Sequence, residues 1–166
     1  KKYPHLKITV NDLYEPLINF WVQLQTFGDE LTEKIREYKS NHPEPVSAKE
    51  LFLNSKKVIN DKSIDDLERA AAFYIVNKCS FSGLTESSSF SQQASNSNFS
   101  MRGIEKLPGY SEIISHWHIN QYSYEYLMRE NVHDGIFMYL DPPYDIKDNL
   151  YGKKGEMHKP VSYTHL

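Results

Sequence analysis

The chain of 166 residues has a single cysteine, Cys79, no long hydrophobic run and no excess of basic residues. One cysteine excludes an intramolecular disulfide and a multi-cysteine zinc site, and it fits a reducing compartment, so we expect a cytoplasmic protein. No stretch approaches the roughly 18 apolar residues of a membrane span, so neither a membrane anchor nor a signal peptide is predicted. The 19 Lys and Arg against 22 Asp and Glu weigh against DNA binding by overall charge, but allow a local basic face.

The residues that are present suffice for one folded core, since 39% are hydrophobic and 13% aromatic. Leu6, Ile8 and Val10 alternate with polar residues at period two, which predicts a first strand. The strand stops before Asp12, and apolar residues at helical spacing predict a helix over 13–24. A strand, an acidic residue and a helix in this order indicate the α/β class.

A helical block is expected over 29–77, inside this α/β pattern. Asp29 is predicted to cap its first helix. Ser47 and Glu50 have the spacing of a capping box and predict the next helix, and Ser63 is predicted to open the last one. Each of these helices has one apolar stripe, as expected of helices that pack together.

The stretch 85–100 has seven serines and a single charge, which predicts a loop. After it we expect a helix over 110–115, a strand over 117–121 and a helix over 124–130. The last predicted element is a strand over 136–140, which is apolar throughout, as is typical of a strand buried on both faces of a parallel sheet.

This last strand leads directly into Asp141-Pro142-Pro143-Tyr144. In open α/β sheets, ligands bind beyond the carboxyl ends of the strands, so these four residues stand where a site is expected. A turn stiffened by proline, with an aspartate that caps it, is the alternative interpretation.

The four residues suit methylation of an exocyclic amino group. The lone pair of such a nitrogen is delocalised into the base, so it is a poor nucleophile. Asp141 and the Pro142 carbonyl can both accept hydrogen bonds from the amino group, and Pro143 fixes the direction of that carbonyl. Tyr144 can stack on a base that has left the duplex.

Two further segments belong with this motif. One is 74–84, which resembles an Asn-Arg then aromatic-Asn-Gly-Leu signature, and the other is Val10-Asn11-Asp12 followed by 17–20. Together with Asp141-Pro142-Pro143-Tyr144, they resemble the adenine-specific DNA methyltransferases typified by the bacterial Dam methylase. The motif at Asp141 is typical of amino-methyltransferases generally, and the segment 74–84 narrows the resemblance to this family.

The resemblance implies S-adenosylmethionine as cofactor and double-stranded DNA as substrate. It implies that Asp12 accepts hydrogen bonds from the cofactor ribose, although a helix N-cap would use the same carboxylate. It implies that Phe81 wedges beside the flipped base, whereas core packing after a helix is the alternative. Lys78, Gly83 and Leu84 belong to the same implied DNA-binding segment.

The chain also departs from the family pattern. Glu86 stands where many members have an arginine that can read guanine, and a glutamate can accept from cytosine only. Ser123 replaces an acidic residue that some members place near the cofactor's adenine. The Phe-x-Gly-x-Gly cofactor loop would precede Lys1, and strands expected after Tyr144 do not follow. We therefore expect an internal fragment that is inactive alone.

The implied fold is a partial Rossmann-like methyltransferase fold with a helical target-recognition insert. Its expected catalytic α/β parts are 1–28 and 106–159. The insert with its loop covers 29–105, and 160–166 reads as a foreign tail.

The preferred function is methylation of adenine N6 in DNA, with a cognate restriction endonuclease as a further expected partner. Cytosine N4 methylation uses the same geometry, but such enzymes more often place serine at the position of Asp141. A DNA-binding module without catalysis is the other alternative. His116 and His118 share one strand face without a third ligand, so no metal site is expected.

Overall fold

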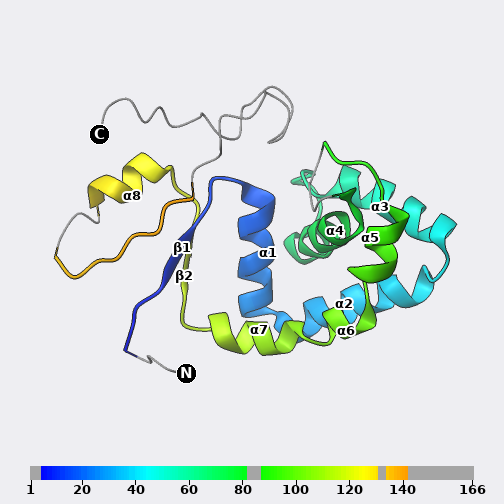
Figure 1. Cartoon of the computed structure of the whole chain (residues 1–166), viewed down its shortest axis with the longest axis horizontal. Coiled ribbons are helices and arrows are strands. Elements are labelled where there is room, and N and C mark those ends of the chain that lie inside the picture. Colours follow the sequence, from blue (N-terminus) through cyan, green and yellow to red (C-terminus); the bar gives the residue numbers. More distant parts are fainter. Residues whose placement is uncertain (1–4, 82–86, 131–133, 142–166) are drawn as a thin grey trace.

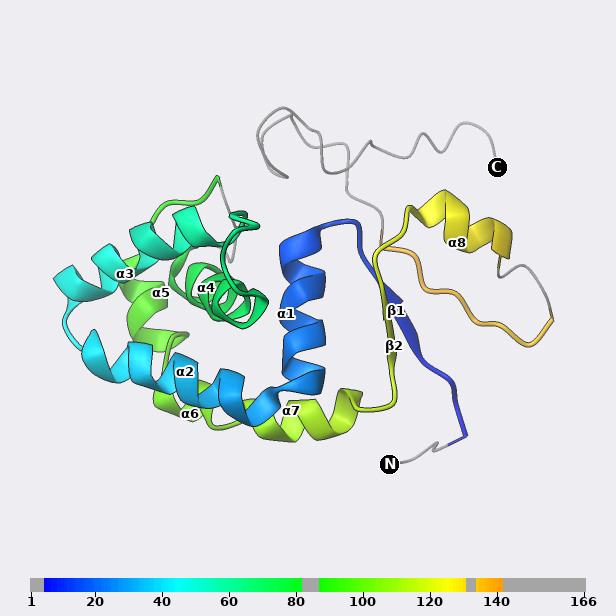
Figure 2. The same cartoon turned by 180° about the vertical axis from the view of Figure 1, so that it is seen from behind.

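Residues 5–81, 87–130 and 134–141 are described by the computed structural model of the chain. Two short parallel strands, β1 (Thr9–Asn11) and β2 (His118–Asn120), lie between helix α1 (Glu15–Thr26) and helix α8 (Tyr124–Glu130) (Figure 1). Most of the remaining helices form a block on the far side of α1, and Figure 2 shows the same order from behind. Within the described residues, no helix is long and apolar enough to cross a membrane.

The whole helical block lies in the connection between the two strands. After α1 the chain runs through α2 (Gly28–Asn41), α3 (Pro45–Val58), α4 (Asp66–Cys79), α5 (Gln92–Ser97), α6 (Met101–Ile104) and α7 (Leu107–Ile114) before it enters β2. Parallel strands need such a crossover connection, and the strand, acidic residue and helix predicted at the start of the chain are confirmed. The helix predicted over 124–130 is also confirmed, and the two strands are shorter than expected.

Helix α4 is the centre of the block. Every residue from Arg69 to Val76 is buried, because α4 packs against α1, α2, α3 and α5. A helix that is apolar nearly all round can be accommodated only in such a position. Three consecutive alanines, Ala70 to Ala72, let the neighbouring helices approach closely, and Figure 1 shows α4 end-on among them.

Two of the predicted helix starts are wrong. Asp29 lies inside the first turn of α2, and no side chain caps that helix. Helix α3 begins at Pro45, before the expected capping box of Ser47 and Glu50, and the Ser47 hydroxyl donates to the Glu44 carbonyl at 2.9 Å. Proline at the first helical position has its φ preset for the helix, so the helix begins earlier than the serine suggests.

The start of α4 is displaced as well. Asp65 is its N-cap, with its side chain accepting a hydrogen bond from the Glu68 N–H at 3.1 Å. Ser63, the predicted opening residue, is held instead by Asp61, whose Oδ1 accepts from the Ser63 N–H at 3.0 Å and from its hydroxyl at 2.6 Å. This turn ahead of the helix occupies the serine, so the cap passes to Asp65.

The serine-rich stretch is not simply a loop. Residues 92–97 form α5, and the Phe99 side chain is fully buried. Two of the serines are N-caps: Ser91 accepts from the Ala94 N–H, and Ser100 accepts from the Gly103 N–H, both at 3.2 Å. Serine is favoured at N-caps as well as in loops, so composition alone gave the wrong prediction here.

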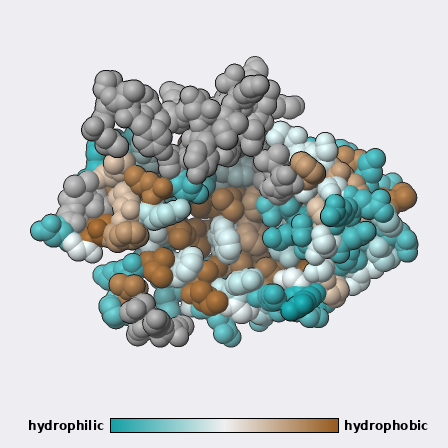
Figure 3. All heavy atoms as spheres, in the orientation of Figure 1, coloured by the Kyte–Doolittle hydropathy of each residue, from teal (hydrophilic) through white to brown (hydrophobic). Residues whose placement is uncertain are grey.

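The apolar run 136–140 is not a buried strand. Phe137 is 90% exposed and Tyr139 is 79% exposed, and among the described residues only β1 and β2 form a sheet. Figure 3 shows hydrophobic side chains gathered over this side of the molecule and over α1, whereas the helical block is largely hydrophilic. The prediction fails because a two-faced buried strand needs paired neighbours and covering helices, and the described residues supply neither to this segment.

We expect the core of the block to tolerate truncation poorly. Phe52→Ala removes a side chain that is 1% exposed, and should lower the free energy of unfolding by about 3–5 kcal/mol in urea denaturation. The matched control is Phe81→Ala, whose side chain is 68% exposed, and which should change it by less than about 0.5 kcal/mol. Equal losses in the two variants would contradict this packing.

Candidate functional site

The Asn11 side chain joins the carboxyl ends of β1 and β2 by hydrogen bonds. The Asn11 side chain donates to the Tyr122 carbonyl at 2.9 Å and accepts from the Tyr122 N–H at 2.8 Å. The Asp12 N–H continues the ladder to the Asn120 carbonyl at 3.4 Å. Asn11 was expected only to end the strand. The signal that could have revealed its role is an amide, with both donor and acceptor, at the edge where two parallel strands end.

Asp12 follows directly, in the turn between β1 and α1. Its side chain is half-buried, and Oδ1 accepts the Tyr14 N–H at 2.7 Å. Tyr14 is the N-cap residue of α1 and makes no side-chain cap itself, so Asp12 fixes the entry of the chain into the helix. Asp12 is therefore not the N-cap of α1, and one oxygen of its carboxylate accepts the N–H of the N-cap residue, at the sheet edge where ligands of α/β folds bind.

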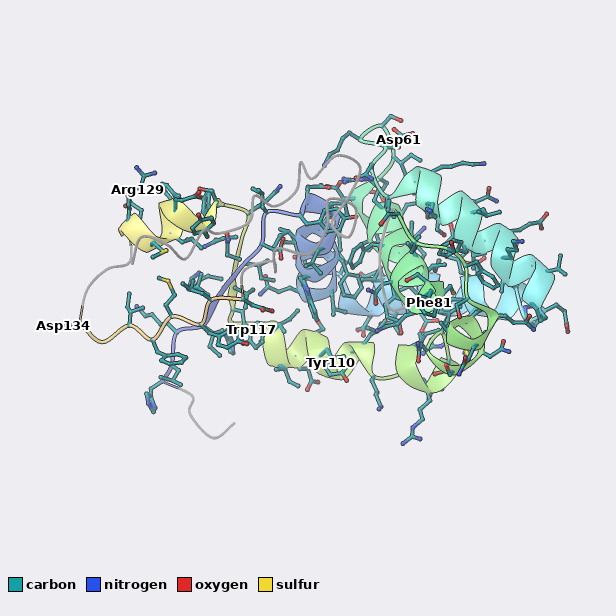
Figure 4. All side chains as sticks on the ribbon, turned by 45° about the horizontal axis from the view of Figure 1, so that its top comes forward. Asp61, Phe81, Tyr110, Trp117, Arg129 and Asp134 are labelled. Carbon is teal, nitrogen blue, oxygen red and sulfur yellow. The ribbon has the colours of Figure 1, made fainter. Side chains whose placement is uncertain are left out.

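Asp141 ends a segment that returns to the strands. After α8 the chain turns back at Gly135, whose φ of 89° lies in the left-handed region that glycine favours. In Figures 1 and 4 the segment 134–141 then runs from Asp134 toward the β1–β2 pair and ends beside it. Asp141 is exposed there, and Pro142, Pro143 and Tyr144 lie outside the described residues.

Phe81 projects from a stem beyond α4 in which residues 79–81 lie opposite residues 89–91. Its N–H donates to the Ser89 carbonyl at 3.1 Å, and Ser80 pairs with Phe90 in an antiparallel bridge. The Phe81 side chain is 68% exposed, so the alternative of core packing is wrong. Gly83, Leu84 and Glu86 lie outside the described residues.

Lys78 lies in the last turn of α4, three residues before Phe81. Its Nζ is 5.6 Å from the centroid of the Tyr74 ring, a cation–π distance that holds the ammonium group against the helix. Burial raises the pKa of Tyr74 to about 12, so this ring carries no charge near neutral pH.

The structure therefore places the predicted residues in two groups. Asp12 and the end of the segment 134–141 belong to the side of the strands. Phe81 and Lys78 belong to the helical block, and Figure 4 shows Phe81 on the other side of α1 from Trp117 and Asp134. A ligand that contacts both groups must be large, as a DNA duplex is.

Comparison with known proteins decides the family. Residues 1–162 match the model of the D12 class N6 adenine-specific DNA methyltransferases. The chain belongs to this family. A comparison with curated proteins finds no match. Membership makes this an S-adenosylmethionine-dependent DNA adenine methyltransferase by family, and it favours neither cytosine N4 methylation nor a module without catalysis.

In this D12-class chain, an ion network around one buried arginine joins α1 to the helical block. Arg69 is 2% exposed, and its guanidinium contacts Glu15 Oε2 at 2.5 Å and Asp66 Oδ1 at 2.7 Å. Its Nε also donates to the Ile59 carbonyl at 3.3 Å, and Lys62 pairs with the second Glu15 oxygen. Sequence reasoning missed Arg69. A basic residue directly before the apolar run 70–76 of α4 is the signal that could have found it.

The network controls the charge state of Glu15. Partial burial pushes the pKa of Glu15 upward, but hydrogen bonds from Arg69 and Lys62 outweigh it and leave the pKa below its ordinary value of 4.5. A carboxyl whose pKa is lowered by folding stabilises the fold when ionised. That contribution is complete above the ordinary pKa and is lost as the pH falls through the lowered one.

Glu15→Gln should therefore make the free energy of unfolding of this methyltransferase depend less on pH in the acid range. At neutral pH we expect a loss of about 1–3 kcal/mol in the free energy of unfolding, because a charged partner of a buried guanidinium is removed. Between about pH 5 and pH 3 the variant should lose less stability than the unsubstituted protein.

The matched control is Glu33→Gln, which breaks the pair with Arg36 at the surface. It should change the free energy of unfolding by less than about 1 kcal/mol. The network has no such role if the two glutamine variants show the same stability at each pH in urea titrations.

Proposed function

We propose that the protein transfers the methyl group of S-adenosylmethionine to N6 of an adenine flipped out of double-stranded DNA. The observation that carries the proposal is the family match over residues 1–162, which includes the Asp141 motif. The parallel strands between α1 and α8 support a Rossmann-like catalytic part, composed of 1–28 and 106–159. The helical block within 29–105 would be the target-recognition insert.

The residues at the carboxyl ends of the strands fit the cofactor. Asp12 offers a half-buried carboxylate in the turn after a parallel strand, and the Tyr14 N–H holds it in place through Oδ1. Ribose hydroxyl groups are donors that such a carboxylate accepts. When bound, S-adenosylmethionine supplies a methyl group on a positively charged sulfur, which keeps the electron pair of the broken bond while N6 gains the methyl group and sheds a proton.

Asp141 and its neighbours would prepare the acceptor nitrogen. Asp141 and the Pro142 carbonyl would accept the two amino hydrogens, which draws N6 toward a tetrahedral geometry and exposes its lone pair. Pro143 would hold the carbonyl in that direction, and Tyr144 would stack on the flipped adenine. Asp141 need not remove a proton first, because the amino proton becomes acidic once N6 is methylated.

The helical block would bring the DNA to this site. Exposed Phe81 is suited to insert beside the flipped base, and Lys78 to neutralise a phosphate nearby. Gly83 and Leu84 would belong to the same DNA-binding segment. Glu86 favours a cytosine contact over the guanine contact of an arginine.

Asp141→Ala should abolish methyl transfer and spare DNA binding. The assay incubates the product of the complete reading frame with duplex DNA and cofactor labelled on its methyl group. We expect at least about a hundredfold loss of rate, because an acceptor aimed at the developing charge is removed. Asp134→Ala, with the same loss of charge in the same segment, should methylate normally. A normal rate in Asp141→Ala would refute the assignment.

Phe81→Ala should weaken DNA binding because base stacking is lost. We expect the Kd for duplex DNA, measured by fluorescence anisotropy, to rise by about 10- to 100-fold. Tyr110→Ala removes another exposed aromatic side chain, on α7, and should leave the Kd unchanged. Similar Kd values for the two variants would show that Phe81 does not contact DNA.

A further inference from the structure

Helix α3 contacts the segment 88–90 of the stem at two points. The Lys56 Nζ donates to the Ser88 carbonyl at 2.8 Å. The same ammonium group lies 5.6 Å from the centroid of the Phe52 ring, one turn earlier in α3. That ring in turn packs against Phe90, with centroids 5.7 Å apart. The segment 88–90 is therefore held to α3 by a hydrogen bond and by an aromatic pair.

The same segment holds the backbone of Phe81. The Ser89 carbonyl accepts the Phe81 N–H at 3.1 Å, and the Ser91 N–H donates to the Cys79 carbonyl at 2.9 Å. The Ser88 carbonyl that Lys56 binds and the Ser89 carbonyl that Phe81 binds belong to consecutive residues. A displacement of Ser88 would thus move Phe81.

Phe81 needs such support because it lies beyond the end of α4 and its side chain is mostly exposed. Packing of its own ring cannot fix its direction, so the backbone contacts of the stem must do so. Ser88 is buried, so its carbonyl accepts the Lys56 ammonium where little water competes. Lys56 supplies the donor, and the Phe52 ring restricts where its ammonium group can lie.

We propose that Lys56 is a positioning residue that sets the direction in which Phe81 projects into DNA and thereby contributes to sequence selection. The inference rests on the proposed function, since it assigns Phe81 to the DNA interface. Its neighbour Lys57 is exposed and has the same charge, so it is the matched control for the loss of a positive charge.

The test compares three variants of the product of the complete reading frame. Lys56→Met keeps an unbranched side chain on Phe52 and removes the donor, Lys56→Arg restores a donor, and Lys57→Met removes a charge only. The target sequence is read from methylated adenines in a pool of random duplexes. Rates are then measured on the target and on duplexes with one base pair changed, and hydrogen exchange is followed in peptides from 79–91.

We expect Lys56→Met to lower the ratio of target to off-target rates by about tenfold, the scale of one lost base contact, and Lys56→Arg to restore most of it. The Phe81 and Ser91 amides should exchange faster in Lys56→Met, with little change in Tm. Lys57→Met should leave the rate ratio and the exchange rates unchanged. It should lower only the slope of the logarithm of DNA affinity against the logarithm of salt concentration, by about one.

An unchanged ratio in Lys56→Met would overturn the inference, and so would an equal loss of ratio in Lys57→Met. If the unsubstituted protein methylates no DNA, the proposed function fails on its own control. Faster exchange in Lys56→Met would then leave Lys56 as a structural anchor alone, and the inference would fall with the function.

Discussion

The contact between the buried Arg69 guanidinium and Glu15 fixes α1, which lies beside the strands, relative to α4 at the centre of the helical block. Glu15 stands in the first turn of α1, three residues after Asp12, and Arg69 stands in the first turn of α4. From Arg69, α4 extends about 15 Å to its end at Cys79, toward the stem of Phe81. Loss of Glu15 would leave the buried guanidinium with Asp66 as its remaining carboxylate partner among the described contacts, which is unfavourable in a protein interior.

The residues proposed to bind the cofactor and the residues proposed to bind DNA lie on two different surfaces. The strand side has the carboxylate of Asp12, tied to the entry of α1, and the segment that ends at Asp141. The helical block has Phe81, which gains its direction from backbone contacts of its stem rather than from its own packing. Under the proposed function, a DNA duplex is long enough to contact both, and the distance between them would set which base reaches Asp141.

The sequence predicted the α/β class and the approximate places of α1 to α4, because apolar periodicity survives in helices that pack on one another. Helix starts were predicted poorly where two capping residues compete, as with Ser63 and Asp65, or where a proline such as Pro45 starts the helix first. The hydrogen bonds between Asn11 and Tyr122 and the ion pair between Arg69 and Glu15 were missed because the partners lie far apart in the chain. The run 136–140 was misjudged because burial depends on neighbouring strands, which hydrophobicity alone does not reveal.

The central claim is that this fold modifies adenine at N6. The most direct measurement digests DNA from cells that lack endogenous adenine methylation and express the complete reading frame, and identifies the modified nucleosides by mass spectrometry. The account predicts N6-methyladenosine as its deoxynucleoside, absent from cells that express Asp141→Ala. N4-methylcytosine in its place, or no modified base in DNA from cells that contain the folded protein, would contradict it.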